Sequence, residues 1–285
     1  MRIEATHSEG NGTVLDKIGD IILHHVSNSE YPIVQLPTMF GINFSITKHV
    51  LMLWVTATIV FTVFFLASKI YRRERYPVPT GLMNALESIV EYLRNQVVIP
   101  NVGKEFSKVW APLILTLFFF ILTANGLGLV PLFDLIPGGS TATGNFNVTA
   151  GLATVTFFSI IVAGSLKYRF LGYWKNMAPK GLPFMVYFIL IPIEIVAMFV
   201  KPFALTLRLA ANMTGGHIAI LSIMSFIFIF GGMFGAGAGI SVGALVSVPL
   251  AVGVSALEII IVFIQAYVFT LLTAIFIGMA IHPHH

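Results

Sequence analysis

Cysteine is absent from this 285-residue chain, and charged residues make up only 10% of it. Without cysteine, the chain has no disulfide framework, no thiolate metal site and no cysteine nucleophile. Soluble proteins carry about 25% charged residues, so the charges present here are too few to cover a water-facing surface. Hydrophobic residues account for 57% of the chain. The surplus apolar surface must face lipid, which predicts an integral membrane protein.

Motifs that indicate enzymes are missing as well. The sequence contains no H-E-x-x-H zinc site and no Gly-Lys-Ser/Thr phosphate loop. We therefore expect no catalytic activity, no cofactor and no metal site. The net charge of +4 comes from basic residues confined to a few loops, which fits orientation in a membrane better than a nucleic-acid surface.

The chain opens with a polar segment that is unlike a signal peptide, because acidic residues precede any apolar run. Residues 13–26 place apolar side chains on one helical face, which predicts a short interfacial helix. We divide the chain into an N-terminal segment, residues 1–48, and an integral membrane domain, residues 49–285.

Hydropathy predicts three membrane spans of ordinary length. A hydrocarbon core of ~30 Å needs about 20 apolar residues in a helix, and residues 50–70, 109–131 and 148–166 meet that requirement. Residues 82–99 also have a helical pattern but carry charges, so we expect them to lie along the membrane surface. Trp54, Trp110 and Trp174 fall near the predicted interfaces, as an aromatic belt requires; these three complete the set of tryptophans.

Two further apolar stretches are too long for a single upright span. As one helix, residues 182–230 would measure roughly 74 Å and residues 244–280 about 55 Å. Each stretch therefore either breaks into two spans or forms one steeply tilted helix. The glycine-rich run 231–243 between them predicts a hairpin turn, although its G-x-x-x-G spacings are also typical of a helix-packing face.

The distribution of lysine and arginine predicts the orientation. Basic residues concentrate in 69–108 and 167–180, whereas 133–147 and 231–243 contain none. The two basic regions are expected in the cytoplasm, or in the matrix of an organelle. The N-terminus then lies on the opposite side, and the alternation is consistent with five transmembrane segments.

Arg208 interrupts the longest apolar stretch. A guanidinium at the bilayer centre costs ~3 kcal/mol on insertion scales and more in simulations, and it does not release its proton. Arg208 must face water, a carboxylate of a partner, or both; the alternative is an internal ion pair with Glu194 or Glu258. Small and polar residues at spacings of three and four share its face, which allows close approach of another helix: Ala204, Ala211, Asn212, Gly215 and Ala219.

Other polar residues in apolar sequence extend this candidate site. Glu258 and Gln265 are seven residues apart and share one face of the last helix, where Gln265 is a suitable neighbour for Arg208 across the hairpin. Glu258 and His217 form a candidate proton-handling pair, although a lone histidine in a helix is also a common structural residue. Asn125, late in the second span, either lines a water path or caps a helix end.

Four segments resemble the a subunit of F-type ATP synthase, and the resemblance extends over nearly the whole chain. Two of them resemble the signature helices of that family, one its second span, and one the start of its first span. They are PIEIVAMFVKPFALTLRLAANMTGGH (192–217), ALEIIIVFIQAYVFTLLTAIF (256–276), TANGLGLVP (123–131) and ITKHVLMLW (46–54).

The resemblance implies an all-α polytopic membrane fold. It consists of a first span, a surface amphipathic helix, a transmembrane hairpin and two long, strongly tilted helices that follow a ring of c subunits. The family's functional arginine matches Arg208, and other family residues match Asn212, Gln265 and Glu194. Some members exchange the acid and the histidine between the positions of His217 and Glu258; this chain has histidine first and glutamate second.

The resemblance also implies a function. We expect a non-catalytic subunit in which two offset half-channels carry protons to and from c-ring carboxylates and so drive ring rotation. Its expected partners are the c-subunit ring, peripheral-stalk b subunits, other ATP synthase subunits and membrane lipid. The expected location is a bacterial plasma (inner) membrane, or alternatively the mitochondrial inner membrane. The alternative function is a secondary transporter that binds an anionic substrate through Arg208, but the sequence shows no repeat of the kind that such transporters contain.

Overall fold

The computed structural model of the chain describes residues 38–39, 42–43, 45–73, 80–129, 142–176 and 184–282. The interfacial helix predicted at 13–26 lies outside these residues. Nearly all described residues are helical, which confirms the all-α prediction. Two short strands, β1 (Thr38–Met39) and β2 (Ile42–Asn43), pair antiparallel ahead of the first long helix.

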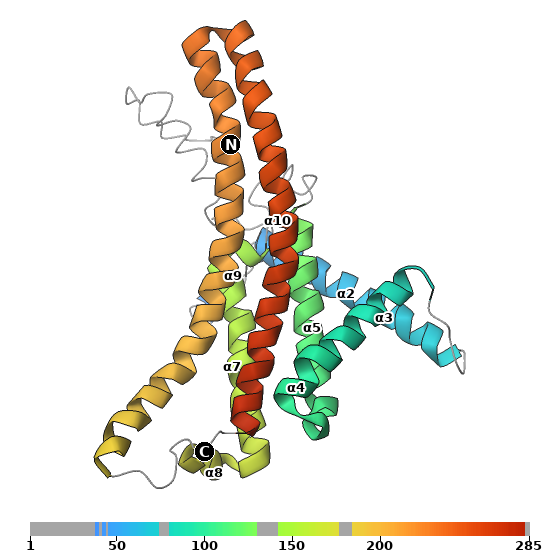
Figure 1. Cartoon of the computed structure of the whole chain (residues 1–285), viewed down its shortest axis with the longest axis vertical. Helices are drawn as coiled ribbons and strands as arrows, with labels where there is room; N and C mark the ends of the chain where they lie inside the picture. Colours follow the sequence, from blue (N-terminus) through green and yellow to red (C-terminus); the bar gives the residue numbers. More distant parts are fainter. Residues whose placement is uncertain are drawn as a thin grey trace.

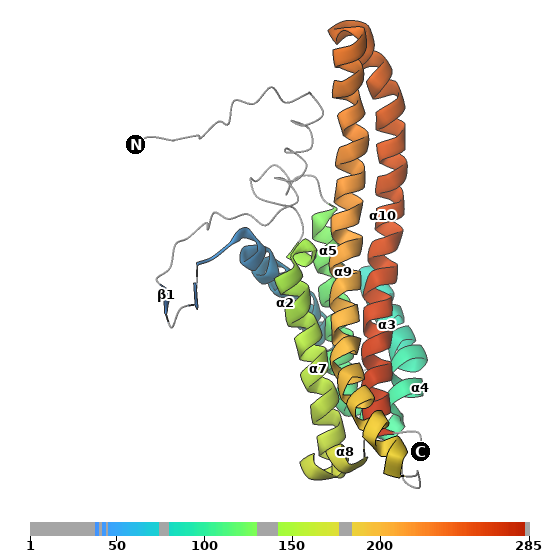
Figure 2. The same ribbon diagram turned by 90° about the vertical axis from the view of Figure 1, so that its left-hand side faces the viewer.

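Five long helices organise the fold (Figures 1 and 2). Each is long and apolar enough to cross a membrane, which confirms the prediction of five spans and a multi-pass membrane protein. The first three begin or end within about five residues of the predicted spans. The helices are α2 (Lys48–Arg73), α5 (Lys104–Gly128), α7 (Phe146–Tyr168), α9 (Phe184–Phe234) and α10 (Ala236–Ile281).

Shorter helices connect the first spans at their basic ends. The helix predicted at 82–99 is present as α3 (Leu82–Leu93), a π-helical turn η1 (Arg94–Val98) and α4 (Ile99–Val102). Gly103 ends this run with a φ of 89°, a conformation that glycine adopts without strain. The Tyr71 hydroxyl at the end of α2 donates a hydrogen bond to the Glu87 carboxylate of α3.

Two short elements were not predicted from the sequence. Helix α8 (Phe170–Asn176) lies in the basic region 167–180, where a loop was expected. A 3₁₀ turn, η2 (Ala142–Gly144), precedes α7. Asn145 caps the start of α7: its side-chain oxygen accepts a hydrogen bond from the backbone N–H of Asn147 at 2.8 Å.

Each of the two over-long stretches is one unbroken helix, so the alternative in which they break into two spans is wrong. Pro192 and Pro202 lie inside α9 without ending it. The two helices pack antiparallel, and their upper part extends beyond the other helices of the bundle in both views (Figures 1 and 2). At 1.5 Å per residue, the 51 residues of α9 span roughly 76 Å, far more than the ~30 Å hydrocarbon core.

The glycine-rich run between these helices serves both purposes that its sequence suggested. The chain turns at Gly235, which has a φ of 87°. On either side, glycines allow the helices to approach closely: a Cβ at Gly243 would lie 2.8 Å from the Ile227 Cα, and one at Gly231 would lie 3.1 Å from the Ile240 side chain. A side chain at Gly243 would require the backbone of α9 to move, and one at Gly231 would require the Ile240 side chain to shift.

The hydrophobic core lies where α3, η1 and α4 meet α5, α7 and the last turns of α10, and α9 contributes two buried leucines to it. Leu93, Ile114 and Ile277 are at most 1% exposed there. Gly278 of α10 packs so closely that an added Cβ would lie 2.1 Å from the Asn101 carbonyl oxygen. Trp110 belongs to this core with 7% of its surface exposed, so it packs inside the bundle rather than in the lipid-facing belt that was expected.

Candidate functional site

Arg208 lies on an exposed face of α9. Four of the five neighbours predicted from helical spacing share that exposure, whereas Ala219 is half-buried. We call the exposed surface the Arg208 face: Ala204, Arg208, Ala211, Asn212 and Gly215. Within the described residues, Arg208 forms no hydrogen bond or ion pair, so the geometry does not place it in an internal pair with Glu194 or Glu258. A guanidinium keeps its charge at any ordinary pH, so this small-residue surface carries a fixed positive charge.

The opposite face of α9 determines which way Arg208 points. Leu205, Leu209 and Met213 are 1%, 0% and 6% exposed, and Leu205 and Leu209 belong to the core. Thr206 is also buried, and its hydroxyl donates to the Pro202 carbonyl at 3.1 Å, which satisfies it within its own helix. Burial of these side chains fixes the rotation of α9 and leaves the Arg208 face outward.

Asn212 and Gln265 join α9 to α10. The Asn212 side-chain amide donates a hydrogen bond to the Gln265 Oε1 at 2.7 Å. Gln265 is 4% exposed, and its Nε2 has no hydrogen-bond partner among the described residues. An unsatisfied buried donor costs about 1–3 kcal/mol. The Gln265 amide is thus an unused donor beside Asn212, which lies one helical turn after Arg208 on α9.

Glu258 reaches α9 at the residue before His217. Its carboxylate packs directly on Gly216, where an added Cβ would lie 1.8 Å from Oε1. Glu258 is 7% exposed, and His217 is half-buried. The structure therefore places the acid and the histidine predicted as a pair on the same turn of the α9–α10 contact, with Gly216 providing the space for the carboxylate.

Glu194 lies apart from these residues. It precedes Arg208 by 14 positions of α9 (208 − 194), or roughly 21 Å along the helix axis, whereas Gly216 follows Arg208. Glu194 is half-buried and close to Tyr173 of α8. Burial raises the pKa of the Tyr173 phenol above its ordinary 10.0, and the charge of Glu194 raises it further. Along α9, Arg208 thus lies between Glu194 and the point at which Glu258 of α10 contacts Gly216.

Asn125 connects α5 to the turn before α7. It is 1% exposed, and its Oδ1 accepts a hydrogen bond from the Thr143 hydroxyl at 2.6 Å. The next residue, Gly144, accepts a hydrogen bond from the Thr214 hydroxyl of α9 at 3.3 Å. Through these contacts η2 is held between α5 and α9. Its contact on α9, Thr214, is two residues from both Asn212 and Gly216.

Sequence patterns missed Gly216, Thr143 and Thr214. Gly216 carried a usable signal, since small residues within membrane helices are typical of places where another helix packs closely. Thr143 and Thr214 carried none, because their roles depend on which turn of α9 lies beside η2. Their hydrogen bonds belong to the tertiary arrangement and have no local pattern.

The chain resembles known proteins over almost its full length. The sequence profile of the family described as ATP synthase A chain matches residues 50–278. The chain is 42% identical over 288 residues to ATP synthase subunit a 2 of Chlorobium luteolum, covering 98% of this chain and 80% of the relative. It is 40% identical to ATP synthase subunit a of Pelodictyon phaeoclathratiforme, with 97% and 78% covered. The corresponding protein of Chlorobium phaeobacteroides is also 40% identical, with 99% and 81% covered.

Proposed function

The chain belongs to the ATP synthase A chain family, and on that basis we propose that it is the proton-translocating stator subunit of an F-type ATP synthase. It is a multi-pass membrane component of the ATP synthase complex. The observation that carries the proposal is the Arg208 face, a fixed cation among small residues on an open helix surface. Such a surface suits a partner helix that approaches closely and carries a carboxylate.

The proposed partner of Arg208 is a carboxylate on each subunit of a c ring. Charge attraction by the guanidinium favours the ionised carboxylate as it passes. When the carboxylate takes up a proton it loses its charge, and most of the cost of entering lipid disappears. The ring can then turn with the neutral carboxyl group in the bilayer, while Arg208 prevents protons from passing straight across.

Two offset half-channels would supply and remove the protons. The inlet would run past Glu258 and His217 to Asn212 and Gln265. The packing of Glu258 on Gly216 and the hydrogen bond from Asn212 to Gln265 support a path along the contact of α9 with α10. The outlet lies toward Glu194, on the far side of Arg208. The separation of the two acids along α9 supports this division, because a proton must leave the chain and travel with the ring between them. Each proton that crosses 100 mV supplies about 2.3 kcal/mol.

The remaining proposals concern the surroundings. We expect the c-subunit ring at the Arg208 face and peripheral-stalk b subunits elsewhere on the bundle, with other ATP synthase subunits completing the complex. The chain itself would be non-catalytic. The organisms of the relatives above are bacteria, which supports a bacterial plasma membrane as the location.

Substitution of Arg208 tests this function. In inverted membrane vesicles containing the whole complex, Arg208→Ala should lower proton-driven ATP synthesis by about 100-fold or more, because the carboxylate is no longer favoured in its ionised form. Arg94→Ala is the matched control, since Arg94 is also exposed but lies on η1. Assembly is checked by the amount of complex in the membrane. Normal synthesis by an assembled Arg208→Ala complex would contradict the proposal.

A further inference from the structure

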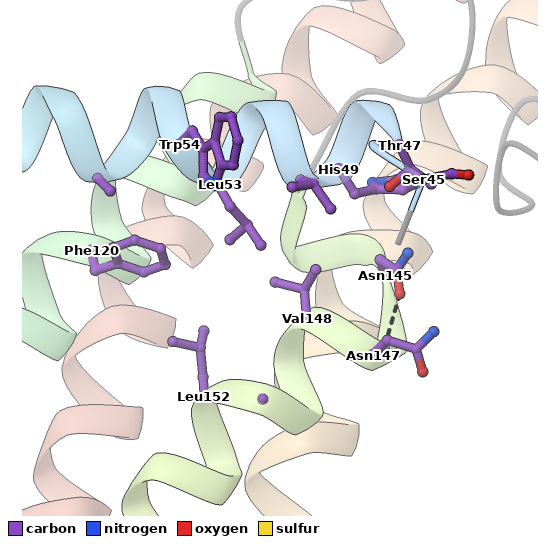
Figure 3. A pocket seen from close by; sticks show the side chains of 13 residues that line it. Ser45, Thr47, His49, Leu53, Trp54, Phe120, Asn145, Asn147, Val148 and Leu152 are labelled. Carbon is purple, nitrogen blue, oxygen red and sulfur yellow. Dashed lines mark hydrogen bonds between the residues drawn. The ribbon is translucent and has the colours of Figure 1, made fainter. Parts of the chain in front are cut away.

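An open groove outside the proposed proton path lies between α2, α5 and the start of α7 (Figure 3). Its volume is about 750 Å³. Helix α2 packs against α5 near Phe64, whose ring centroid lies 4.9 Å from that of Phe119 in an edge-to-face contact. The first turns of α2 and of α7 line the space on two sides. We call the resulting space the α2–α7 pocket.

The α2–α7 pocket is polar at one end and apolar at the other. The polar end carries side chains from the start of α2 and the start of α7, namely Ser45, Thr47, His49, Asn145 and Asn147. Figure 3 shows them gathered together, away from the apolar lining, which includes Leu53, Trp54, Phe120, Val148 and Leu152. Hydroxyl, imidazole and amide groups therefore lie at the helix starts, and hydrocarbon lines the deeper part.

The depth of the pocket corresponds to one leaflet of a bilayer. Along α7 its lining runs from Asn145 to Leu152, roughly 10 Å at the helical rise, whereas one leaflet of hydrocarbon is about 15 Å thick. Below this depth α2 and α5 are in contact through Phe64 and Phe119. A membrane-crossing helix spans the full ~30 Å, so most of its length would lie outside the pocket.

The polarity also matches one class of molecule. Trp54, at the rim, is 62% exposed, and tryptophan is enriched where headgroups meet hydrocarbon. The side-chain amide of Asn147 forms no hydrogen bond within the described residues, so it remains available to a ligand. The polar end lies at the ends of α2 and α7 opposite the basic regions.

We propose that the α2–α7 pocket binds one phospholipid from the leaflet opposite the basic loops. Its headgroup and ester region lie among Ser45, His49 and Asn147, and the first part of an acyl chain packs on Leu53, Phe120 and Leu152. The lipid fills the wedge that α2 leaves open and completes the contact between α2 and α7. This inference does not depend on the proposed proton path.

Photochemical crosslinking in the whole complex tests what occupies the pocket. A diazirine amino acid placed at Val148 should yield an adduct with the mass of one phospholipid, and the adduct should survive washing with detergent that removes bulk lipid. The same amino acid at Val155 of α7, 43% exposed and outside the pocket, is the control and should lose its lipid adduct on washing. An adduct to another protein subunit, or none at Val148, would overturn the proposal.

Filling the pocket provides a second, independent test. Leu152→Trp from one wall and Ala57→Phe from the other should each reduce by one the number of phospholipids that native mass spectrometry finds on the delipidated complex. Val155→Trp adds the same bulk to the same helix outside the pocket and should leave the number unchanged. Equal lipid numbers in all assembled complexes would refute the proposal, whatever their ATP synthesis rates.

Discussion

Helices α9 and α10 lie side by side, yet they place their polar residues on opposite sides. On α9, Arg208 and Asn212 face outward among alanine and glycine. On α10, Glu258 and Gln265 face inward with 7% and 4% of their surface exposed. The outward side of α10 carries large apolar side chains instead, including Leu257, Ile260, Ile261, Phe263 and Ile264, each more than 40% exposed.

This difference separates two tasks that a proton-translocating subunit must perform. The Arg208 face of α9 combines small residues with a charge, as required of a surface past which a partner's carboxylate moves. The inward side of α10 holds its polar groups in fixed contact with α9, as required of groups that pass protons along the seam. Large apolar residues on the outer side of α10 fit contact with lipid or with a partner's apolar surface. Under the proposed function, α9 would meet the moving partner, and α10 would position the groups that deliver the proton.

After the loss of Arg208 itself, the largest effect is expected where bulk is added to the Arg208 face. Ala211 is exposed, so Ala211→Leu should not disturb packing inside the chain, but it should keep the c ring from approaching. Overpacking costs about 1–3 kcal/mol, which corresponds to roughly a 5- to 150-fold loss of proton-driven ATP synthesis. Ile260→Phe adds bulk to the outer side of α10 and should lower the rate much less. Equal rates for the two variants would remove the distinction between the helices.

A smaller loss of proton transport is expected when a methyl group fills the space that Gly216 leaves for the Glu258 carboxylate. A Cβ at Gly216 would meet the end of a flexible side chain, so Gly216→Ala should fold and assemble while the carboxylate moves aside. A displacement of this size at a proton-transfer group should slow ATP-driven proton pumping about tenfold. Gly253→Ala of α10 is the control, because no atom lies within 4 Å of its added Cβ.

Shortening the acid provides the complementary change. In the double variant Gly216→Ala/Glu258→Asp, the shorter side chain leaves room for the new methyl group, so pumping should exceed that of Gly216→Ala alone. Glu258→Asp by itself should pump more slowly than the parent, because its carboxylate no longer reaches Gly216. Additive losses in the double variant would show that Gly216 does not act through Glu258.

Much of the fold could be predicted because membranes impose simple length rules. The spans near 50–70 and 148–166 matched α2 and α7, and the turn in 231–243 was found at Gly235. Helix α8 was missed because its basic and aromatic residues resemble an interfacial loop. Trp110 was assigned to the membrane interface from its position near the start of a span, and only packing against other helices reveals its burial.

The candidate site was also predictable only in part: residues on one helix could be grouped, but contacts between helices could not. Helical spacing alone placed Arg208 with Ala211 and Asn212 on one face, because residues three and four apart must share a side of a helix. Spacing within one helix cannot give the register between two helices. The contact of Glu258 with Gly216 and the hydrogen bond from Thr143 to Asn125 both depend on that register.

The smallest effect is expected from the hydrogen bond that joins the outward and inward residues. Asn212 donates to Gln265 at 2.7 Å, and a neutral hydrogen bond contributes about 0.5–1.5 kcal/mol. Asn212→Ala and Gln265→Ala should therefore each lower proton-driven ATP synthesis by roughly 2- to 12-fold. If the two side chains act through this bond, the double variant should be little worse than the more severe single variant. A double variant whose loss equals the product of the single losses would mean that Asn212 serves the outer face and Gln265 the inner seam independently. The division between the helices would then be complete, with no side-chain link between the surface that meets the ring and the groups that deliver the proton.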